Sequence, residues 1–143
     1  TTDLGIKRAC NTGGQSEHKE GRAWDWGVLA SSPSQKAIAD GVLAALTETD
    51  ECGVTYALVR RLGIMYMIWN HQIWRAYKPH LGWQPYGGSN DHTDHVHFSF
   101  SWQGAKQQTS YWTGESNPPG DETAPVCTPA AVSGYAGPNG GNV

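Results

Sequence analysis

The sequence predicts an α+β fold built around an antiparallel sheet, and two observations lead to this class. First, its 143 residues are enough for one domain with a hydrophobic core of its own. Second, two helical stretches come before a run of strands. We expect the helices to pack on one side of the sheet, in a single domain over residues 1–113.

A start signal marks the first helix. Ser32 is a capping residue, Pro33 takes the first helical position, and Gln35 lies three residues after the cap. We expect this helix to end at about Glu48, and a short strand over residues 25–30 to precede it. Its predicted buried stripe consists of Ile38, Val42, Ala45 and Leu46.

Shorter elements follow in the second half of the chain. Residues 55–62 predict a second helix, closed by Gly63. Residues 64–69 and 72–77 are rich in aromatic and branched side chains and predict a β-hairpin. Residues 78–93 predict a long loop, and residues 114–143, dominated by Gly, Pro, Ser, Thr and Ala, predict a tail or linker.

Composition excludes two classes of function. The net charge is −3 and only ten residues are Lys or Arg, without a basic run, which argues against a nucleic-acid binder. No apolar stretch approaches the ~20 residues of a membrane span. Thr1 begins no signal peptide. We therefore expect a soluble chain, monomeric, and either a mature protein or an excised fragment.

Two short segments carry the chemistry. SEHKEGRAWD spans residues 16–25, and DHVHF spans residues 94–98. Catalytic zinc is usually held by three His, Asp or Glu side chains, with a fourth position left for water. His18, Asp25 and His97 supply that number of ligands, and Asp94 remains as a base.

The spacing of the first two ligands requires a bend. On a straight helix His18 and Asp25 would lie about 10 Å apart, too far for two bonds of ~2 Å to one ion. Gly21 between them permits the necessary turn.

Residues 95–102 alternate in polarity, which predicts a half-buried strand. His95 and His97 share its more polar face, about 6.6 Å apart. We expect one of them to bind the metal and the other to stand beside it.

The first segment fits the pattern HxxGxAxD at every fixed position, and Ser16 extends it to SxHxxGxAxD. The chain thereby resembles the zinc peptidase superfamily of D-Ala-D-Ala carboxypeptidases and peptidoglycan endopeptidases, which shares its fold with the Hedgehog signalling domain. That family has a carboxylate three residues before a ligating His, and Asp94 precedes His97 by three. The resemblance covers residues 4–102, and residues 62–86 resemble secreted or phage-borne actinobacterial members.

The resemblance implies a role for each residue of the two motifs. His18, Asp25 and His97 would be the ligands of one zinc ion per chain. Asp94 would be the catalytic acid and base, and His95 a neighbouring or transition-state-stabilising group.

The implied substrate is the stem peptide of bacterial peptidoglycan. Cleavage of D-Ala-D-Ala by a carboxypeptidase, and of an L-Ala-D-Glu bond or cross-link by an endopeptidase, both remain open. Family carboxypeptidases carry an Arg upstream of the first motif that binds the terminal carboxylate; Arg8 is a clamp of this kind or a solvated charge. Trp83 and Tyr86, in the long loop, are the candidate ligand contacts.

The implied location is outside the cytoplasm, either secreted, attached to the cell wall, or in a phage lysin. Disulfides persist there. Cys10, Cys52 and Cys127 form an odd set without metal-binding spacing. We expect a Cys10–Cys52 bridge, with the other pairings and three reduced thiols as alternatives.

Seven Trp and six Tyr favour an alternative function, a non-catalytic wall or glycan-binding module, because aromatic rings stack on sugar faces. Only the peptidase requires a metal ion. Glu17 and Glu20 rival Asp94 as bases, and Ser16 is expected to orient the motif through a hydrogen bond. His71, His80 and His92 are expected to be ordinary loop or hairpin histidines.

Overall fold

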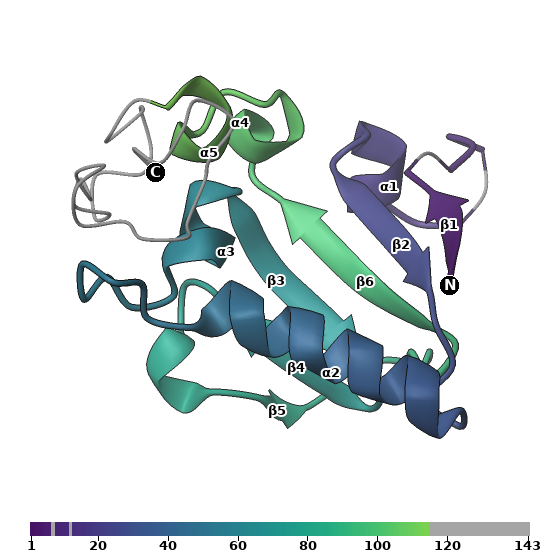
Figure 1. The fold of residues 1–143 in the computed structure, drawn as a ribbon. Coiled ribbons are helices and arrows are strands. Elements are labelled where there is room, and N and C mark those ends of the chain that lie inside the picture. Colours follow the sequence, from purple (N-terminus) through teal and green to yellow (C-terminus); the bar gives the residue numbers. More distant parts are fainter. Residues whose placement is uncertain (7, 12, 115–143) are drawn as a thin grey trace. The chain divides into compact units, whose positions relative to one another are not determined.

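The computed structural model describes residues 1–6, 8–11 and 13–114 (Figure 1). The described part is an α+β fold with an open, six-stranded antiparallel sheet and a few helices, which confirms the predicted class. The chain divides into two compact units. Of the described residues, the first unit contains those in the ranges 1–42 and 65–100, and the second contains those in the ranges 43–64 and 101–114.

The sheet places the last strand of the chain near its middle. Its strands lie in the order β1 (Thr2–Gly5), β2 (Ala23–Gly27), β6 (His95–Phe100), β3 (Ile64–Trp69), β4 (Gln72–Arg75) and β5 (Gln84–Pro85). Because β6 is flanked by a strand on each side, its residues 95–99 are all buried. The predicted strand is therefore present but more deeply covered than expected.

The pairing of β2 with β6 determines which side chains share a face. Asp25 lies opposite His97, and Gly27 lies opposite His95. The other face carries Trp24 and Phe98, whose rings stack with centroids 5.4 Å apart. Alternation along both strands thus separates a polar face from an apolar one.

The predicted hairpin is confirmed as β3 and β4. Its two turn residues, Asn70 and His71, have φ angles of 47° and 66°, as a two-residue turn of this hand requires. Their backbone N–H groups donate to the carbonyls of His92 and Asp91 at 2.8 and 2.9 Å. The turn therefore holds the segment that leads into β6. The predicted loop before β6 contains a 3₁₀ turn, η1 (Pro79–Leu81), and the short strand β5.

The first long helix, α2 (Pro33–Thr47), begins at the predicted position. Its buried residues are Ala39, Leu43 and Leu46. The predicted stripe was therefore wrong except at Leu46: Ala45 is exposed, and Ile38 and Val42 are 52% and 40% exposed.

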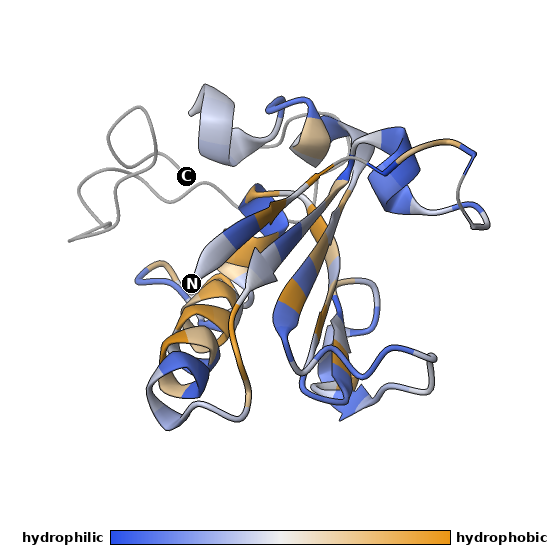
Figure 2. Cartoon of the chain, turned by 90° about the vertical axis from the view of Figure 1, so that its right-hand side faces the viewer, coloured by the Kyte–Doolittle hydropathy of each residue, from blue (hydrophilic) through white to orange (hydrophobic). Residues whose placement is uncertain are grey.

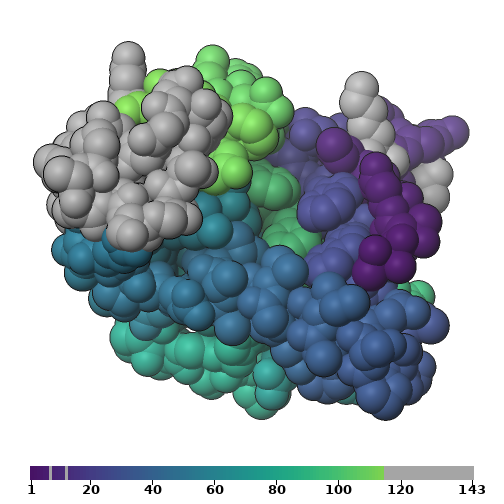
Figure 3. All heavy atoms as spheres, viewed as in Figure 1, coloured from purple at the N-terminus to yellow at the C-terminus, as the bar shows by residue number. Residues whose placement is uncertain are grey.

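The reason is that apolar residues occur at adjacent positions of α2, so periodicity does not identify its inner face. Apolar colour extends around the long helix in Figure 2, and its outer side forms part of the surface in Figure 3. A hydrogen bond within the first unit fixes the orientation of α2 instead: Trp69 Nε1 donates to Asp40 Oδ1 at 3.0 Å.

The described part of the second unit contains three short helices, α3 (Ala57–Arg61), α4 (Trp102–Ala105) and α5 (Ser110–Thr113). The second predicted helix is confirmed as the shorter α3. Gly63, with φ of 71°, follows it and lies against Gly104 of α4. A Cβ on Gly104 would lie 2.7 Å from the carbonyl oxygen of Leu62, so only glycine fits there.

The expected Cys10–Cys52 bridge is wrong. Cys10 is free and exposed, whereas Cys52 is disulfide-bonded. The two cysteines belong to different units, and Asp50 Oδ1 holds Cys52 in a turn by accepting its backbone N–H at 3.0 Å. Cys127 and the predicted tail, from residue 115 onward, lie outside the described residues.

The surroundings of Gly104 and Gly41 predict opposite effects of an alanine substitution on stability. Gly104→Ala should destabilise the protein by about 1–3 kcal/mol, because the methyl group meets backbone atoms that cannot rotate away. Gly41→Ala, within α2 and without neighbours in 4 Å, should stabilise it by about 0.5–1 kcal/mol. Urea unfolding curves of both variants measure the difference, and equal midpoints would contradict the close packing.

Candidate metal centre

A bend brings the first two predicted ligands together. His18 lies in the single turn of α1 (Glu17–Glu20), which ends at Gly21 with a left-handed φ of 73°. The chain then turns into β2, where Asp25 lies. His18 Nε2 and Asp25 Oδ1 are 3.2 Å apart, as the predicted bend requires.

The register of the sheet adds the third ligand. His97 Nδ1 lies 3.0 Å from Asp25 Oδ1 and 3.3 Å from His18 Nε2. Ligand atoms around a tetrahedral zinc ion, with bonds of 2.0–2.2 Å, lie about 3.3–3.5 Å from one another. The donors His18, Asp25 and His97 therefore fit one metal ion, and together they form the metal group.

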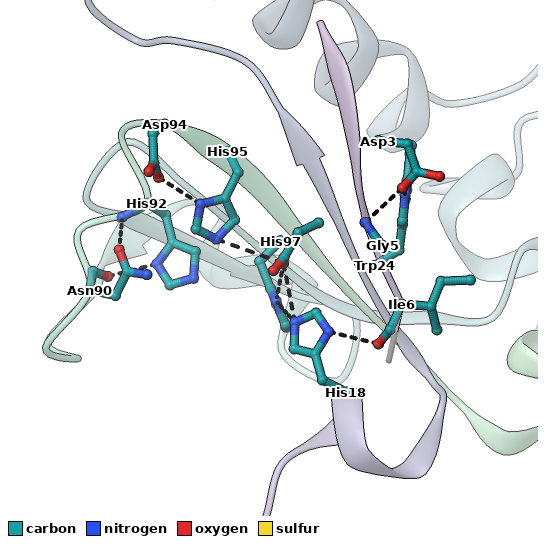
Figure 4. A network of polar contacts seen from close by, with 11 residues as sticks. Asp3, Gly5, Ile6, His18, Trp24, Asn90, His92, Asp94, His95 and His97 are labelled. Atoms are coloured by element: carbon teal, nitrogen blue, oxygen red, sulfur yellow. Dashed lines mark hydrogen bonds and ion pairs between the residues drawn. The ribbon is translucent and has the colours of Figure 1, made fainter. Parts of the chain in front are cut away.

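Outer hydrogen bonds fix two of the nearby imidazoles. His18 Nδ1–H donates to the Ile6 carbonyl at 2.9 Å, so that Nε2 faces Asp25 (Figure 4). His95 Nδ1–H donates to Asp94 Oδ1 at 2.7 Å. Metal-binding histidines are commonly oriented by an oxygen acceptor on the outer nitrogen.

The carboxylate of Asp25 is held in its ionised form. Burial would raise the pKa of Asp25, but the hydrogen bond from His97 and the charges of His18, His97 and His95 outweigh burial and lower it. A half-buried, ionised carboxylate between two imidazoles is a suitable ligand for a divalent cation.

Asp94 approaches the metal group only through His95. Its side chain is 70% exposed, and in Figure 4 it lies beyond His95 as seen from His97. His95 Nε2 points the other way and lies 3.7 Å from Asp25 Oδ1. The hydrogen bond from His95 is the main cause that lowers the pKa of Asp94. His97 thus joins the metal group and His95 stands beside it, as expected for two neighbours on one strand face.

His92 belongs to the site, although it was expected to be an ordinary loop residue. It is only 7% exposed, and its ring centroid lies 4.7 Å from that of His95 and 5.7 Å from that of His97. Its Nδ1–H donates to the Asn90 carbonyl at 2.6 Å, and burial lowers its pKa. The signal available in the sequence was the run HTDHVH, residues 92–97, which contains all three imidazoles.

Tyr86 lies beside this cluster. Its ring meets that of His92 edge to face, with centroids 5.2 Å apart. A Cβ on Gly88 would overlap the Tyr86 ring, so the glycine provides the space in which this ring lies.

The other two predicted substrate contacts are less directly placed. The backbone N–H of Arg8 donates to the His18 carbonyl at 3.4 Å, and its side chain is exposed. Trp83 is half-buried in the loop before β5. Among the described residues, no ring contact joins Trp83 to the histidines.

Tyr66 of β3 was not foreseen. Its ring stacks on His97 with centroids 5.6 Å apart and an interplanar angle of 24°. Burial raises the pKa of Tyr66 to about 12, the Ser99 hydroxyl opposes this effect, and the adjacent Glu17 carboxylate adds to it. Glu17 therefore faces Tyr66, and the hydroxyl of Tyr66 keeps its proton at neutral pH.

Arg22 and Glu20 of the first motif have structural partners, whereas Ser16 differs from them. Arg22 Nε donates to Glu20 Oε2 at 2.5 Å, and Arg22 Nη1 donates to the Phe100 carbonyl at 3.0 Å. Glu20 is thus neutralised by Arg22. The expected orienting bond of Ser16 is absent in the described part of the chain, where its buried hydroxyl has no hydrogen-bond partner.

A family comparison covers all of these metal-group residues. The family described as the VldE C-terminal domain matches residues 1–97, about two thirds of the chain. The chain belongs to this family. The matched range of this VldE-type domain ends at His97 and includes His18, Asp25, Asp94 and His95. Comparison with curated proteins and with solved structures gave no match.

The metal group predicts that this VldE-type domain binds one divalent metal ion, for which zinc is the probe. His97→Ala should weaken zinc binding by more than the ~10–100-fold that loss of an outer-shell partner costs. His80→Ala, which alters an exposed histidine of η1, should leave the affinity unchanged. Titration against a chromophoric chelator measures both constants, and equal affinities would exclude His97 as a ligand.

Proposed function

We propose that this domain is a zinc-dependent peptidase that hydrolyses the stem peptides of bacterial peptidoglycan. The observation that carries the proposal is the convergence of two imidazoles and one carboxylate within 3.0–3.3 Å, next to a hydrogen-bonded Asp–His pair. The motifs SxHxxGxAxD and DHVH support it through their resemblance to zinc D-Ala-D-Ala carboxypeptidases and peptidoglycan endopeptidases.

The donor set favours zinc in a catalytic role. Two nitrogen ligands and one carboxylate are typical of catalytic zinc, whereas structural zinc usually has four protein ligands. A bound zinc ion would supply a water of lowered pKa and polarise the scissile carbonyl. Within the part of the chain that the structure describes, the metal group has three members.

The Asp94–His95 pair supports acid–base catalysis. Asp94 accepts the Nδ1 proton of His95, so Nε2 is the atom available to take a proton on the side of the metal group. We propose that Asp94 and His95 act as one unit, in which Asp94 stabilises the imidazolium that forms. This refines the role of Asp94, whose exposed carboxylate acts through the imidazole.

A pocket next to Asp94 supports a place for part of the substrate. A pocket of about 400 Å³ in the first unit is lined by Asp94 and by apolar residues that include Leu4, Val28 and Leu29. We propose that it receives a small side chain of the substrate. Arg8 would bind a substrate carboxylate through its forked guanidinium, and Tyr86 and Trp83 would contact the peptide.

The resemblance extends this proposal to fold and location. We propose that the α+β fold is that of the Hedgehog domain and the D-Ala-D-Ala peptidases. We also propose that the protein works outside the cytoplasm, as a secreted or wall-associated enzyme or a phage lysin, and that it is a monomer. No helix in residues 1–6, 8–11 and 13–114 is both long and apolar enough to cross a membrane.

Exposed aromatic side chains favour the second candidate, a glycan-binding module. Tyr77, at 63% exposure, follows β4, and Trp102, at 51%, begins α4. Such rings stack on sugars without needing a metal. Digestion of purified peptidoglycan, followed by mass spectrometry of released fragments, separates the candidates and identifies the bond cleaved.

The acid–base pair predicts a specific pattern of rates. Asp94→Asn should lower kcat by about 100- to 10,000-fold while zinc remains bound, because the carboxylate no longer supports His95. His95→Gln should have a similar effect, and the double variant should be no slower than the slower single variant. Steady-state rates on a stem peptide test this pattern. An Asp94→Asn enzyme with the wild-type rate would remove the pair from the mechanism.

The space beside Gly88, which the Tyr86 ring fills, predicts that a larger residue at position 88 weakens substrate binding. Gly88→Ala should displace the Tyr86 ring and raise KM with a smaller effect on kcat, because Tyr86 contacts substrate and leaves the metal group intact. Gly87→Ala is the matched control, since nothing lies within 4 Å of a Cβ there. Identical KM values for the two variants would exclude a contact between Tyr86 and the peptide.

A further inference from the structure

The orientation of His97 differs from that of its neighbours. His18, His92 and His95 each present Nε2 inward, and each has its Nδ1–H held by an oxygen acceptor. His97 instead turns Nδ1 toward Asp25. The described residues supply no hydrogen bond to its Nε2. The ring of His97 therefore lacks the outer hydrogen bond that usually orients a metal ligand.

Tyr66 occupies the position that can replace this bond. β3 contributes no member of the metal group, but the Tyr66 ring lies nearly parallel to the His97 ring, at 5.6 Å between centroids. Tyr66 is half-buried, and its neighbour Met67 is fully buried in the core. A ring fixed at its base by a buried strand restricts rotation of the imidazole stacked on it.

The other end of Tyr66 reaches the element that carries His18. The Glu17 carboxylate is near enough to raise the pKa of the Tyr66 hydroxyl, and Glu17 directly precedes His18 in α1. Arg22 Nη2 also approaches Glu17 Oε1, at 3.8 Å. Tyr66 therefore stacks on one candidate ligand on β6 and lies near the residue that precedes a second one in α1.

We propose that Tyr66 is a positioning residue of the metal centre, whose ring stack on His97 takes the place of the missing outer hydrogen bond. The proximity of its hydroxyl to Glu17 has a secondary role. The inference rests on the metal site of the proposed function, and it does not depend on which bond the enzyme cleaves.

The test compares loss of the ring with loss of the hydroxyl. Tyr66→Leu removes the stack and should weaken zinc binding by about 10–100-fold, as loss of an outer-shell partner does. Tyr66→Phe keeps the stack and should remain close to wild-type affinity. Tyr77→Leu, at an exposed tyrosine after β4, is the matched control and should have no effect.

Two readouts distinguish positioning from general stability. Chelator competition gives the zinc affinity, and the visible absorption of the Co²⁺-loaded protein reports the geometry of the ligands. We expect Tyr66→Leu to change the Co²⁺ spectrum while circular dichroism stays native, and Tyr66→Phe to keep the spectrum. If the leucine variant does not fold, Tyr66→Met, which preserves apolar volume, takes its place.

A wild-type Co²⁺ spectrum and zinc affinity in the variant without the ring would overturn the proposal. An equally large loss in Tyr66→Phe would overturn it too, because the hydroxyl would then carry the effect. If the wild-type protein binds no zinc, this inference and the proposed function fail together. If it binds zinc but releases no fragments from peptidoglycan, only the peptidase fails.

Discussion

The candidate site depends on the register between β2 and β6. Directly opposed residues in an antiparallel pair project on the same face with side chains about 5 Å apart, and this register places Asp25 opposite His97. A slip by one residue would turn either side chain to the opposite face. Trp24 and Phe98 stack on that opposite face, so the packing that stabilises the sheet also secures the ligand pair.

The same site shows how a folded protein accommodates a buried cluster of imidazoles and a carboxylate. His18 and His97 are 6% and 8% exposed, and burial alone would oppose the charge of Asp25. Short local contacts compensate: carbonyls and a carboxylate accept the outer protons of His18, His92 and His95. Each acceptor comes from a segment adjoining the sheet, so the imidazoles are oriented before any ion binds.

Local patterns made much of this arrangement predictable. The spacing of His18, Gly21 and Asp25 required a bend, and the alternation after Asp94 required a strand; both are present. The hairpin was recognisable from two apolar runs around Asn70 and His71. In each case the determining residues lie within about ten positions of one another, which is the range over which backbone periodicity acts.

The remaining features depend on contacts between distant segments. His92 joins the site because the hairpin turn holds its backbone, and Tyr66 joins it because β3 lies next to β6. The inner face of α2 was ambiguous because Ile38 and Ala39 are both apolar, as are Val42 and Leu43. Cys10 is free whereas Cys52 is disulfide-bonded, a difference that no local pattern encodes.

The two backbone bonds from the hairpin turn to Asp91 and His92 have an evolutionary consequence. They separate residues 87–89, which are all exposed, from the histidines that follow. Insertions or exchanges in this short surface segment would reshape the approach to the site while the imidazoles keep their places, since exposed loops accept such changes at little cost. The approach to the metal group can therefore diverge within the family independently of the residues that could hold an ion.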